Sequence, residues 1–158
     1  MTVRRISVAA AAVALVALTG MGKTSVAPRI VAVELQPEDP SPGGEFIVVT
    51  NAGTAALDLG CWRVASSTGM LVVAPPLRLA PGAVTLLSAR TSWLRQTDRV
   101  RLFDTKRRLR VATPTLTDPA ADDRVWFREA DGSWHLARKS FGKGVITGHL
   151  VTRASSRC

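Results

Sequence analysis

Short apolar runs separated by turn residues fill the sequence after residue 28, and this pattern constrains the fold more than any other feature. The runs begin about every 8 to 14 residues. No window holds a helical apolar period over three turns, and the 9 prolines oppose long helices. Short strands at this spacing are typical of a β-sandwich or β-barrel. The chain has 158 residues, which suits a single domain, so we predict one all-β domain.

Turn residues bound the predicted strands, and apolar positions alternate within them. The pair Asp131-Gly132 predicts a hairpin between the last two runs. Val100 and Leu102 alternate with arginines, as expected for a sheet with one buried and one wet face. The predicted strands span residues 30–35, 45–50, 57–64, 70–73, 83–88, 99–103, 124–128 and 134–137.

Residues 1–27 have the pattern of a secretory signal peptide. Arg4 and Arg5 precede an apolar stretch over residues 6–18, which is shorter than a membrane-spanning helix needs. Small residues permit cleavage after Ala27 or, upstream, near Gly20. We therefore predict export to a secreted or cell-envelope location. An uncleaved short anchor and a twin-arginine signal are the alternatives.

The remaining chain divides into a domain over residues 28–138 and a basic tail over residues 139–158. The tail has one apolar run, at residues 145–151, which is either a last strand or a frayed end. Because oxidation is favoured in an exported chain, Cys61 and Cys158 can form a disulfide that pins the tail to the domain. The alternative is that Cys61 is a small buried residue and Cys158 a free thiol.

Five motifs follow one another in the order found in a known domain family. The first two are a Glu-aromatic-Ile strand that runs into an Asn and a small-residue turn, and an Asp-Leu-x-Gly-Trp strand. A Leu-x-Pro-Gly turn, a Trp followed by an Asp-x-Val-x-Leu strand, and a Trp-x-Arg-x-x-Asp-Gly segment come next. Here the motifs occupy residues 45–54, 58–62, 79–87, 93–102 and 126–132. From about residue 29 to residue 137 the chain therefore resembles the lamin tail domain, an immunoglobulin-like β-sandwich.

The resemblance implies an immunoglobulin-like sandwich and a role in binding. Members of the family are associated with DNA or chromatin in some settings, and bacterial members accompany secreted or surface proteins. This sequence departs from the family pattern at Val48, where a second acid is usual, and at Cys61, where glycine is usual. The family's Thr-Pro-Gly ending is also missing.

Trp62 is the predicted anchor of the core, because burying a ring of that size removes a large apolar area from water. The segment 51–53 (Asn-Ala-Gly) can adopt the positive φ that a tight turn needs. Four apolar side chains are expected to pack around the tryptophan: Phe46, Leu59, Leu86 and Leu102.

Motifs for catalysis or metal binding are scarce. A serine hydrolase needs a histidine aligned with an acid and a serine, yet the sequence has no Gly-x-Ser-x-Gly motif. The loop acids Asp118, Asp122 and Asp123 match no calcium-loop spacing and are interpreted as solvated. The residue types of a zinc site are present without the usual close pairs: Cys61, His135, His149 and Cys158. We predict no enzymatic activity, no metal and no cofactor.

Positive charge is concentrated in one segment. The 21 Lys and Arg outnumber the 12 Asp and Glu, and three of the resulting +9 charges lie in residues 1–27. Between residues 95 and 110 only Asp98 and Asp104 oppose seven basic residues, most of which can lie on one hairpin. These seven are Arg95, Arg99, Arg101, Lys106, Arg107, Arg108 and Arg110. Arginine suits bidentate contacts with phosphate and carboxylate, although an arginine-rich edge also prevents strand pairing.

The sequence as a whole predicts an exported, non-catalytic binding or structural module that contacts an anionic partner through this hairpin. An anionic polymer of the cell envelope, nucleic acid or an acidic protein fits that chemistry, and no small-molecule substrate is evident. Two alternatives are an accessory or degenerate hydrolytic domain using His135 or His149, and a structural envelope protein with no ligand.

Overall fold

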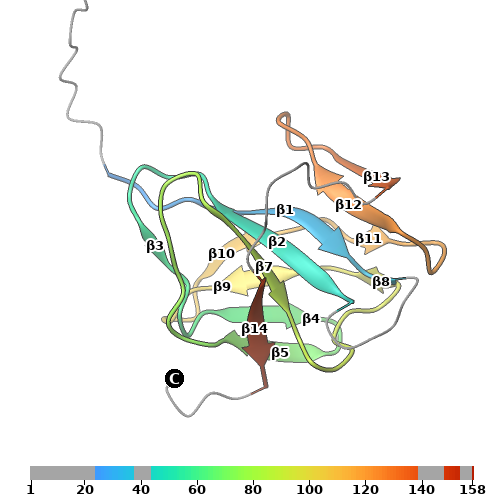
Figure 1. Ribbon diagram of the computed structural model, residues 1–158, viewed down its shortest axis with the longest axis horizontal. Coiled ribbons are helices and arrows are strands. Elements are labelled where there is room, and N and C mark those ends of the chain that lie inside the picture. The colour runs from blue at the N-terminus through green and yellow to red at the C-terminus, as the bar shows by residue number, and fades with distance from the viewer. Residues whose placement is uncertain (1–23, 38–43, 139–147, 154–157) are drawn as a thin grey trace, which may run out of the picture.

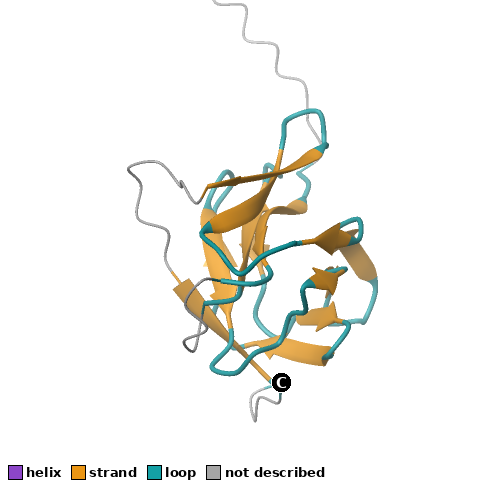
Figure 2. Cartoon of the chain, turned by 90° about the vertical axis from the view of Figure 1, so that its right-hand side faces the viewer, coloured by secondary structure: helices purple, strands orange, loops and turns teal. Residues whose placement is uncertain are grey.

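The computed structural model describes residues 24–37, 44–138, 148–153 and 158 (Figure 1). These residues form strands and loops with no helix, so the all-β prediction is confirmed (Figure 2). Among them there is accordingly no helix with the length and apolar character that crossing a membrane requires. The predicted signal peptide lies mostly outside the described residues and stays a prediction. In chain order the strands are β1 (Pro28–Glu34), β2 (Phe46–Asn51), β3 (Leu57–Asp58), β4 (Arg63–Ser66), β5 (Gly69–Val73), β6 (Arg78–Leu79), β7 (Val84–Ser88), β8 (Thr97–Asp98), β9 (Arg101–Phe103), β10 (Leu109–Ala112), β11 (Leu116–Thr117), β12 (Arg124–Arg128), β13 (Trp134–Arg138) and β14 (Gly148–Thr152).

Ten strands form one curled sheet in the order β10-β9-β4-β5-β14-β7-β2-β1-β12-β13 (Figure 1). Two short pairs, β11-β8 and β3-β6, complete the described structure. Strand β14 runs antiparallel to β5 and parallel to β7, so it joins a four-stranded half to a five-stranded half. The assignment to the immunoglobulin-like type is finer than this arrangement and stays a prediction.

The main hydrophobic core draws side chains from both halves of the sheet, which curls around it. Ile47 and Val49 of β2 face this core together with Val64 of β4 and Leu102 of β9. Trp62 is 6% exposed and belongs to the same cluster, as the sequence predicts. Leu59 joins it there, so two of the four expected neighbours of Trp62 lie in its cluster.

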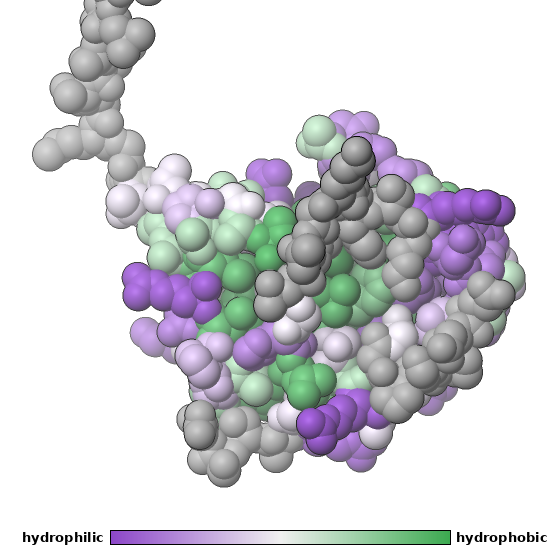
Figure 3. All heavy atoms as spheres, viewed as in Figure 1, coloured by the Kyte–Doolittle hydropathy of each residue, from purple (hydrophilic) through white to green (hydrophobic). Residues whose placement is uncertain are grey.

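Phe46 and Leu86 do not pack in the Trp62 cluster, and this part of the core prediction is wrong. Successive side chains of a strand point to opposite faces, so Phe46 and Val48 face away from Ile47 and Val49. They form a second, smaller cluster with Val125, against which Leu86 packs. Figure 3 shows that apolar surface continues over the region of β2 and β7.

The predicted hairpin at Asp131-Gly132 is confirmed, since β12 and β13 pair antiparallel on either side of it. Gly132 has a φ of 91°, a backbone conformation that residues with a side chain rarely adopt. The Asp131 carboxylate accepts hydrogen bonds from the amide (2.9 Å) and hydroxyl (2.7 Å) of Ser133 and thereby holds the turn. The hairpin lies at one end of the sheet order and extends from the body (Figure 1).

Gly53 serves close packing, and none of residues 51–53 has the positive φ that this segment could adopt. A Cβ atom at Gly53 would lie 2.1 Å from the Ser25 carbonyl oxygen. The Ser25 carbonyl accepts hydrogen bonds from the amides of Thr54 and Ala55, and the Ala27 carbonyl accepts one from Ala52. Residues 25–27 therefore dock on the loop after β2 and belong to the folded domain.

The C-terminal tail is tied to the domain in two ways. Strand β14 covers much of the run predicted as a last strand, whereas residues 139–147 and 154–157 lie outside the described part. A disulfide joins Cys61, in the turn before β4, to Cys158. Of the two sequence alternatives for these cysteines, the structure therefore has the bonded one.

Candidate anion-binding surface

The basic segment forms a hairpin made of β9, β10 and the turn at residues 104–108, here called the basic hairpin. The Asp104 carboxylate organises the turn by accepting hydrogen bonds from the amides of Lys106 and Arg108, both at 2.9 Å. Arg107 lies at the tip with a φ of 60°, in the left-handed region. The turn thereby projects its basic side chains into solvent.

Two of the seven predicted basic residues pair with Asp104, which offsets one of their two charges. Arg108 Nε lies 2.8 Å and Arg110 Nη1 3.5 Å from Asp104 Oδ2. Desolvation by burial tends to raise the pKa of Asp104, but the hydrogen bonds and charge of Arg108 outweigh it, so the pKa is lowered. Arg108 and Arg110 thus stabilise the turn as well as contributing charge.

Asp98, the other acid in the segment, mainly fixes backbone. Its carboxylate accepts hydrogen bonds from the amides of Ser67 (2.8 Å), Arg95 (3.1 Å) and Arg99 (2.8 Å). The Arg99 guanidinium turns instead to the Thr113 carbonyl, with Nε 3.1 Å from the oxygen. Asp98 therefore orients the segment before β9 and forms no ion pair with a described basic side chain.

Five exposed basic residues remain without an ion pair among the described residues: Arg95, Arg99, Arg101, Lys106 and Arg107. Arg101 projects from the outer face of β9, because its neighbour Leu102 is fully buried. Lys106 and Arg107 lie on the turn. The structure thus places three of the five on the basic hairpin and two in the segment leading to it.

The sequence analysis missed Arg63. Strand β4 pairs with β9 in the register Arg63↔Phe103 and Val64↔Leu102. Opposed residues of an antiparallel pair share a face, so Arg63 lies on the outer face with Phe103 and Arg101. Its alternation with the buried Val64 is the signal that could have identified it. Leu109, 53% exposed and opposite Phe103, adds apolar area to this face.

Strand β10 is the last strand at its end of the sheet order. Its exposed Arg110 and the neighbouring Arg108 place charge along an unpaired backbone edge. Charge at such an edge opposes pairing with another strand. The position of the hairpin therefore agrees with both interpretations of the basic segment, anion binding and edge protection.

Each of the two histidines contacts a different part of the structure. His135 Nδ1 lies 3.0 Å from Glu129 Oε1 beside the β12–β13 turn, and both side chains are about half exposed. His149 Nε2 lies within hydrogen-bond distance of the Ala74 carbonyl oxygen. These contacts orient each ring toward a partner other than a serine hydroxyl.

The loop acids between β11 and β12 differ from one another, and the interpretation of all three as solvated is wrong for Asp118. Asp118 is fully buried, and burial raises the pKa of its carboxyl group. Asp122 pairs with Arg124, whose Nε lies 2.7 Å from Asp122 Oδ2, while Asp123 is exposed. Within the described residues, no three His, Cys, Asp or Glu side chains are grouped so that they could hold a metal ion.

The chain was also compared with known proteins. No family model matches the chain, and no curated protein matches it.

Proposed function

We propose that this chain is an exported, non-catalytic binding module of lamin-tail type whose partner is an anionic polymer or an acidic protein. The observation that carries the proposal is the group of exposed, unpaired cations on the basic hairpin and its outer face. Arg101, Lys106 and Arg107 lie there beside Arg63, while Asp104 is occupied by Arg108 and Arg110. Export and family membership rest on the sequence pattern.

One backbone angle supports the family resemblance. Cys61 stands where the family usually has glycine, and its φ is 63°. This left-handed conformation favours glycine over residues with a Cβ atom. The position is therefore one at which a family built on the same turn would use glycine.

The chemistry of the outer face suits an extended polyanion. Arginine presents planar, bidentate donors to phosphate, sulfate or carboxylate groups, and neutralising several of them releases counterions. Phe103 and Leu109 supply apolar contact next to the charges. A partner of this kind is expected to bind with a steep dependence on salt.

Retention on heparin and on DNA at about 0.15 M salt tests the proposal. We expect Arg101→Gln/Lys106→Gln/Arg107→Gln to elute at clearly lower salt than the wild type, with a salt slope reduced by about one per lost contact. The matched control is Arg78→Gln/Arg90→Gln/Arg153→Gln, which removes the same charge from exposed positions elsewhere. Equal elution of the two triple variants would show that net charge alone drives retention and would contradict the proposal.

A further inference from the structure

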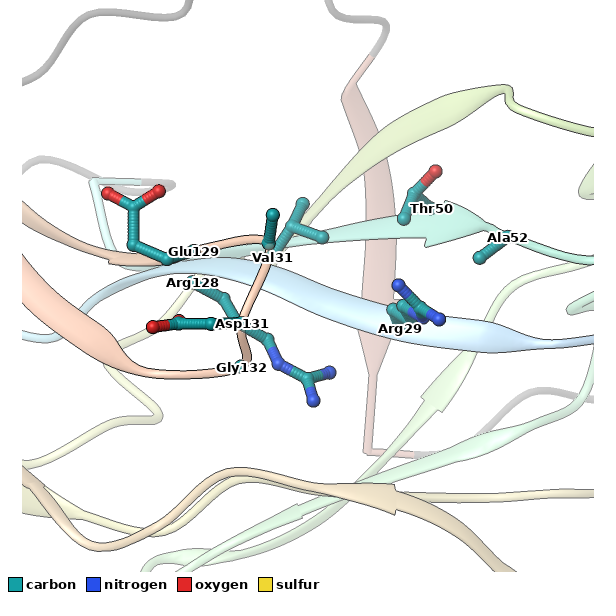
Figure 4. A pocket seen from close by; sticks show the side chains of 9 residues that line it. Arg29, Val31, Thr50, Ala52, Arg128, Glu129, Asp131 and Gly132 are labelled. Atoms are coloured by element: carbon teal, nitrogen blue, oxygen red, sulfur yellow. The ribbon is translucent and has the colours of Figure 1, made fainter.

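A second basic feature lies on another part of the sheet, between β1, β2 and the β12–β13 turn. A pocket of about 320 Å³ opens there, and Arg29 and Arg128 line it with Thr50 and the turn residues 129–132 (Figure 4). Strand β12 lies near the opposite end of the sheet order from the basic hairpin. None of the residues that line the pocket belongs to the basic hairpin, although β1 also contacts β10 where the sheet curls.

The register of β1 and β12 brings the two arginines to the same pocket. Ala32 lies opposite Phe127 and Val33 opposite Trp126, so the start of β1 approaches the β12–β13 turn. A Cβ atom at Gly132 would come 3.5 Å from Arg128 Nη2, which shows that this guanidinium passes against the turn. In Figure 4 the guanidinium groups of Arg29 and Arg128 lie on the same side of the turn.

The two acids at the rim of the pocket are held by other partners. Glu129 contacts His135 at 3.0 Å, and Asp131 accepts hydrogen bonds from Ser133. Both carboxylates point away from the guanidinium groups in Figure 4. Among the described residues neither Arg29 nor Arg128 has an ion pair, so both guanidinium groups are free to donate to a ligand, while Glu129 and Asp131 bring the formal charge of the lining to zero.

We propose that this pocket binds a phosphate group carried by a small molecule. Two guanidinium groups match the charge of a phosphate monoester, which is about −1.5 to −2 near neutral pH, better than that of a single carboxylate. They also offer paired N–H donors in the planar geometry that oxyanions accept. The pocket volume is at the lower end of the range for small-ligand sites, which favours a compact ligand.

Titration of the full-length, disulfide-bonded protein with inorganic phosphate tests this site. The signals of arginine Nε–H groups in NMR spectra report binding, with sodium chloride at equal ionic strength as the blank and acetate as the carboxylate probe. We expect phosphate, and neither chloride nor acetate, to shift the Arg29 and Arg128 signals. Arg29→Gln and Arg128→Gln should each weaken phosphate binding about tenfold or more.

Two further variants make the test specific. Arg78→Gln, at an exposed arginine of β6, should bind phosphate like the wild type. Glu129→Gln should bind phosphate more tightly, because it removes a negative charge from the rim. Equal affinity of Arg29→Gln, Arg128→Gln and Arg78→Gln overturns the proposal, and acetate binding as tight as that of phosphate overturns the assignment to a phosphate group.

Discussion

Asp104 illustrates at the residue scale how one carboxylate can build a positively charged surface. It accepts hydrogen bonds from two turn amides and from the Arg108 and Arg110 side chains. These contacts hold Arg107 at the tip in a conformation with positive φ. The acid thus stabilises the turn that presents the unpaired cations.

The lowered pKa of Asp104 gives a pH prediction. A carboxyl group whose pKa is lower in the folded than in the unfolded state stabilises the fold above the unfolded value, and this contribution is lost as the pH falls through the folded value. Asp104→Asn should therefore lower the free energy of unfolding at about pH 6, and its difference from the wild type should shrink below the usual Asp pKa of 3.8. Urea denaturation at several pH values measures this.

Asp123→Asn is the control, because it neutralises an exposed acid outside the hairpin. Its effect on the free energy of unfolding should be small at every pH. If the difference between wild type and Asp104→Asn stayed constant down to about pH 2, the carboxylate would not be the stabilising form.

At this scale the sequence locates the charged segment but not the state of each charge. Counting Asp98 and Asp104 as two opposing charges is arithmetically right, yet one fixes backbone amides and the other pairs with Arg108 and Arg110. Asp118 shows the same limit more strongly. It is fully buried, and nothing in its Pro-rich, acidic loop sequence distinguishes it from the neighbouring acids. Hydrogen-bond partners depend on tertiary contacts that local composition does not encode.

Among the elements, the segment 25–27 shows most directly how packing sets a domain boundary. It lies before β1 and hydrogen-bonds to the loop after β2, where Gly53 leaves room for it. A signal-peptidase cut after Ala27 would remove the segment from the mature domain, whereas a cut near Gly20 keeps it. Both cleavage sites stay predictions, and the packing of residues 25–27 shows what each would keep or remove.

Gly53→Ala tests the docking of this segment. The added methyl group would collide with backbone atoms of Ser25 and Ala27, so the segment must leave. We expect a loss of about 1–3 kcal/mol in a chain that includes residues 25–27, from the hydrogen bonds that are broken. In a chain that begins at Pro28 the same substitution should cost less than about 0.5 kcal/mol. Equal losses in the two chains, measured by urea denaturation, would contradict this account.

Strands were predictable where apolar periodicity was strong. The run 45–50 and the hairpin flanking residues 131–132 correspond closely to β2, β12 and β13. The run 57–64 was predicted as one strand, but the structure divides it into β3 and β4 around a turn with positive φ at Cys61. β10 was not predicted as a separate strand, because Leu109–Ala112 is only four residues long and none of them is fully buried at this edge of the sheet.

On the scale of the whole molecule, β14 and the disulfide join parts that are far apart in the sequence. β14 lies between β5 and β7, and Cys158 is bonded to Cys61 across a separation of 97 residues. Cross-linking a long loop removes conformational freedom from the unfolded chain. The bond and the strand therefore act together to keep the two halves of the sheet in one body.

Cys61→Ser/Cys158→Ser should lower the free energy of unfolding by about 2–5 kcal/mol, the usual range for a native disulfide that closes a long loop. Chemical denaturation measures the loss. The wild type in the presence of a reductant should match the double variant, which separates loss of the bond from any effect of the serines. Equal stability of the oxidised wild type and the double variant would show that the bond contributes nothing.

The all-β class followed from the sequence, but the sheet order did not. A period of two residues specifies which side chains share a face, and it says nothing about which strands are neighbours. The same period does not reveal that β14 lies beside β7 in a parallel orientation. For the same reason, the approach of Arg29 to Arg128 required the register of β1 and β12.

The position of β14 also has a consequence for the order in which the molecule can be completed. Every other strand precedes β14 in the sequence, so a chain growing from its N-terminus has the neighbouring edges of β5 and β7 before it has the strand that fills them. Unpaired edges accept any strand of suitable length. The strand that closes the gap between β5 and β7 is thus made after both of its neighbours, and the bond that ties it to Cys61 can form only once Cys158, six residues after β14, has been added.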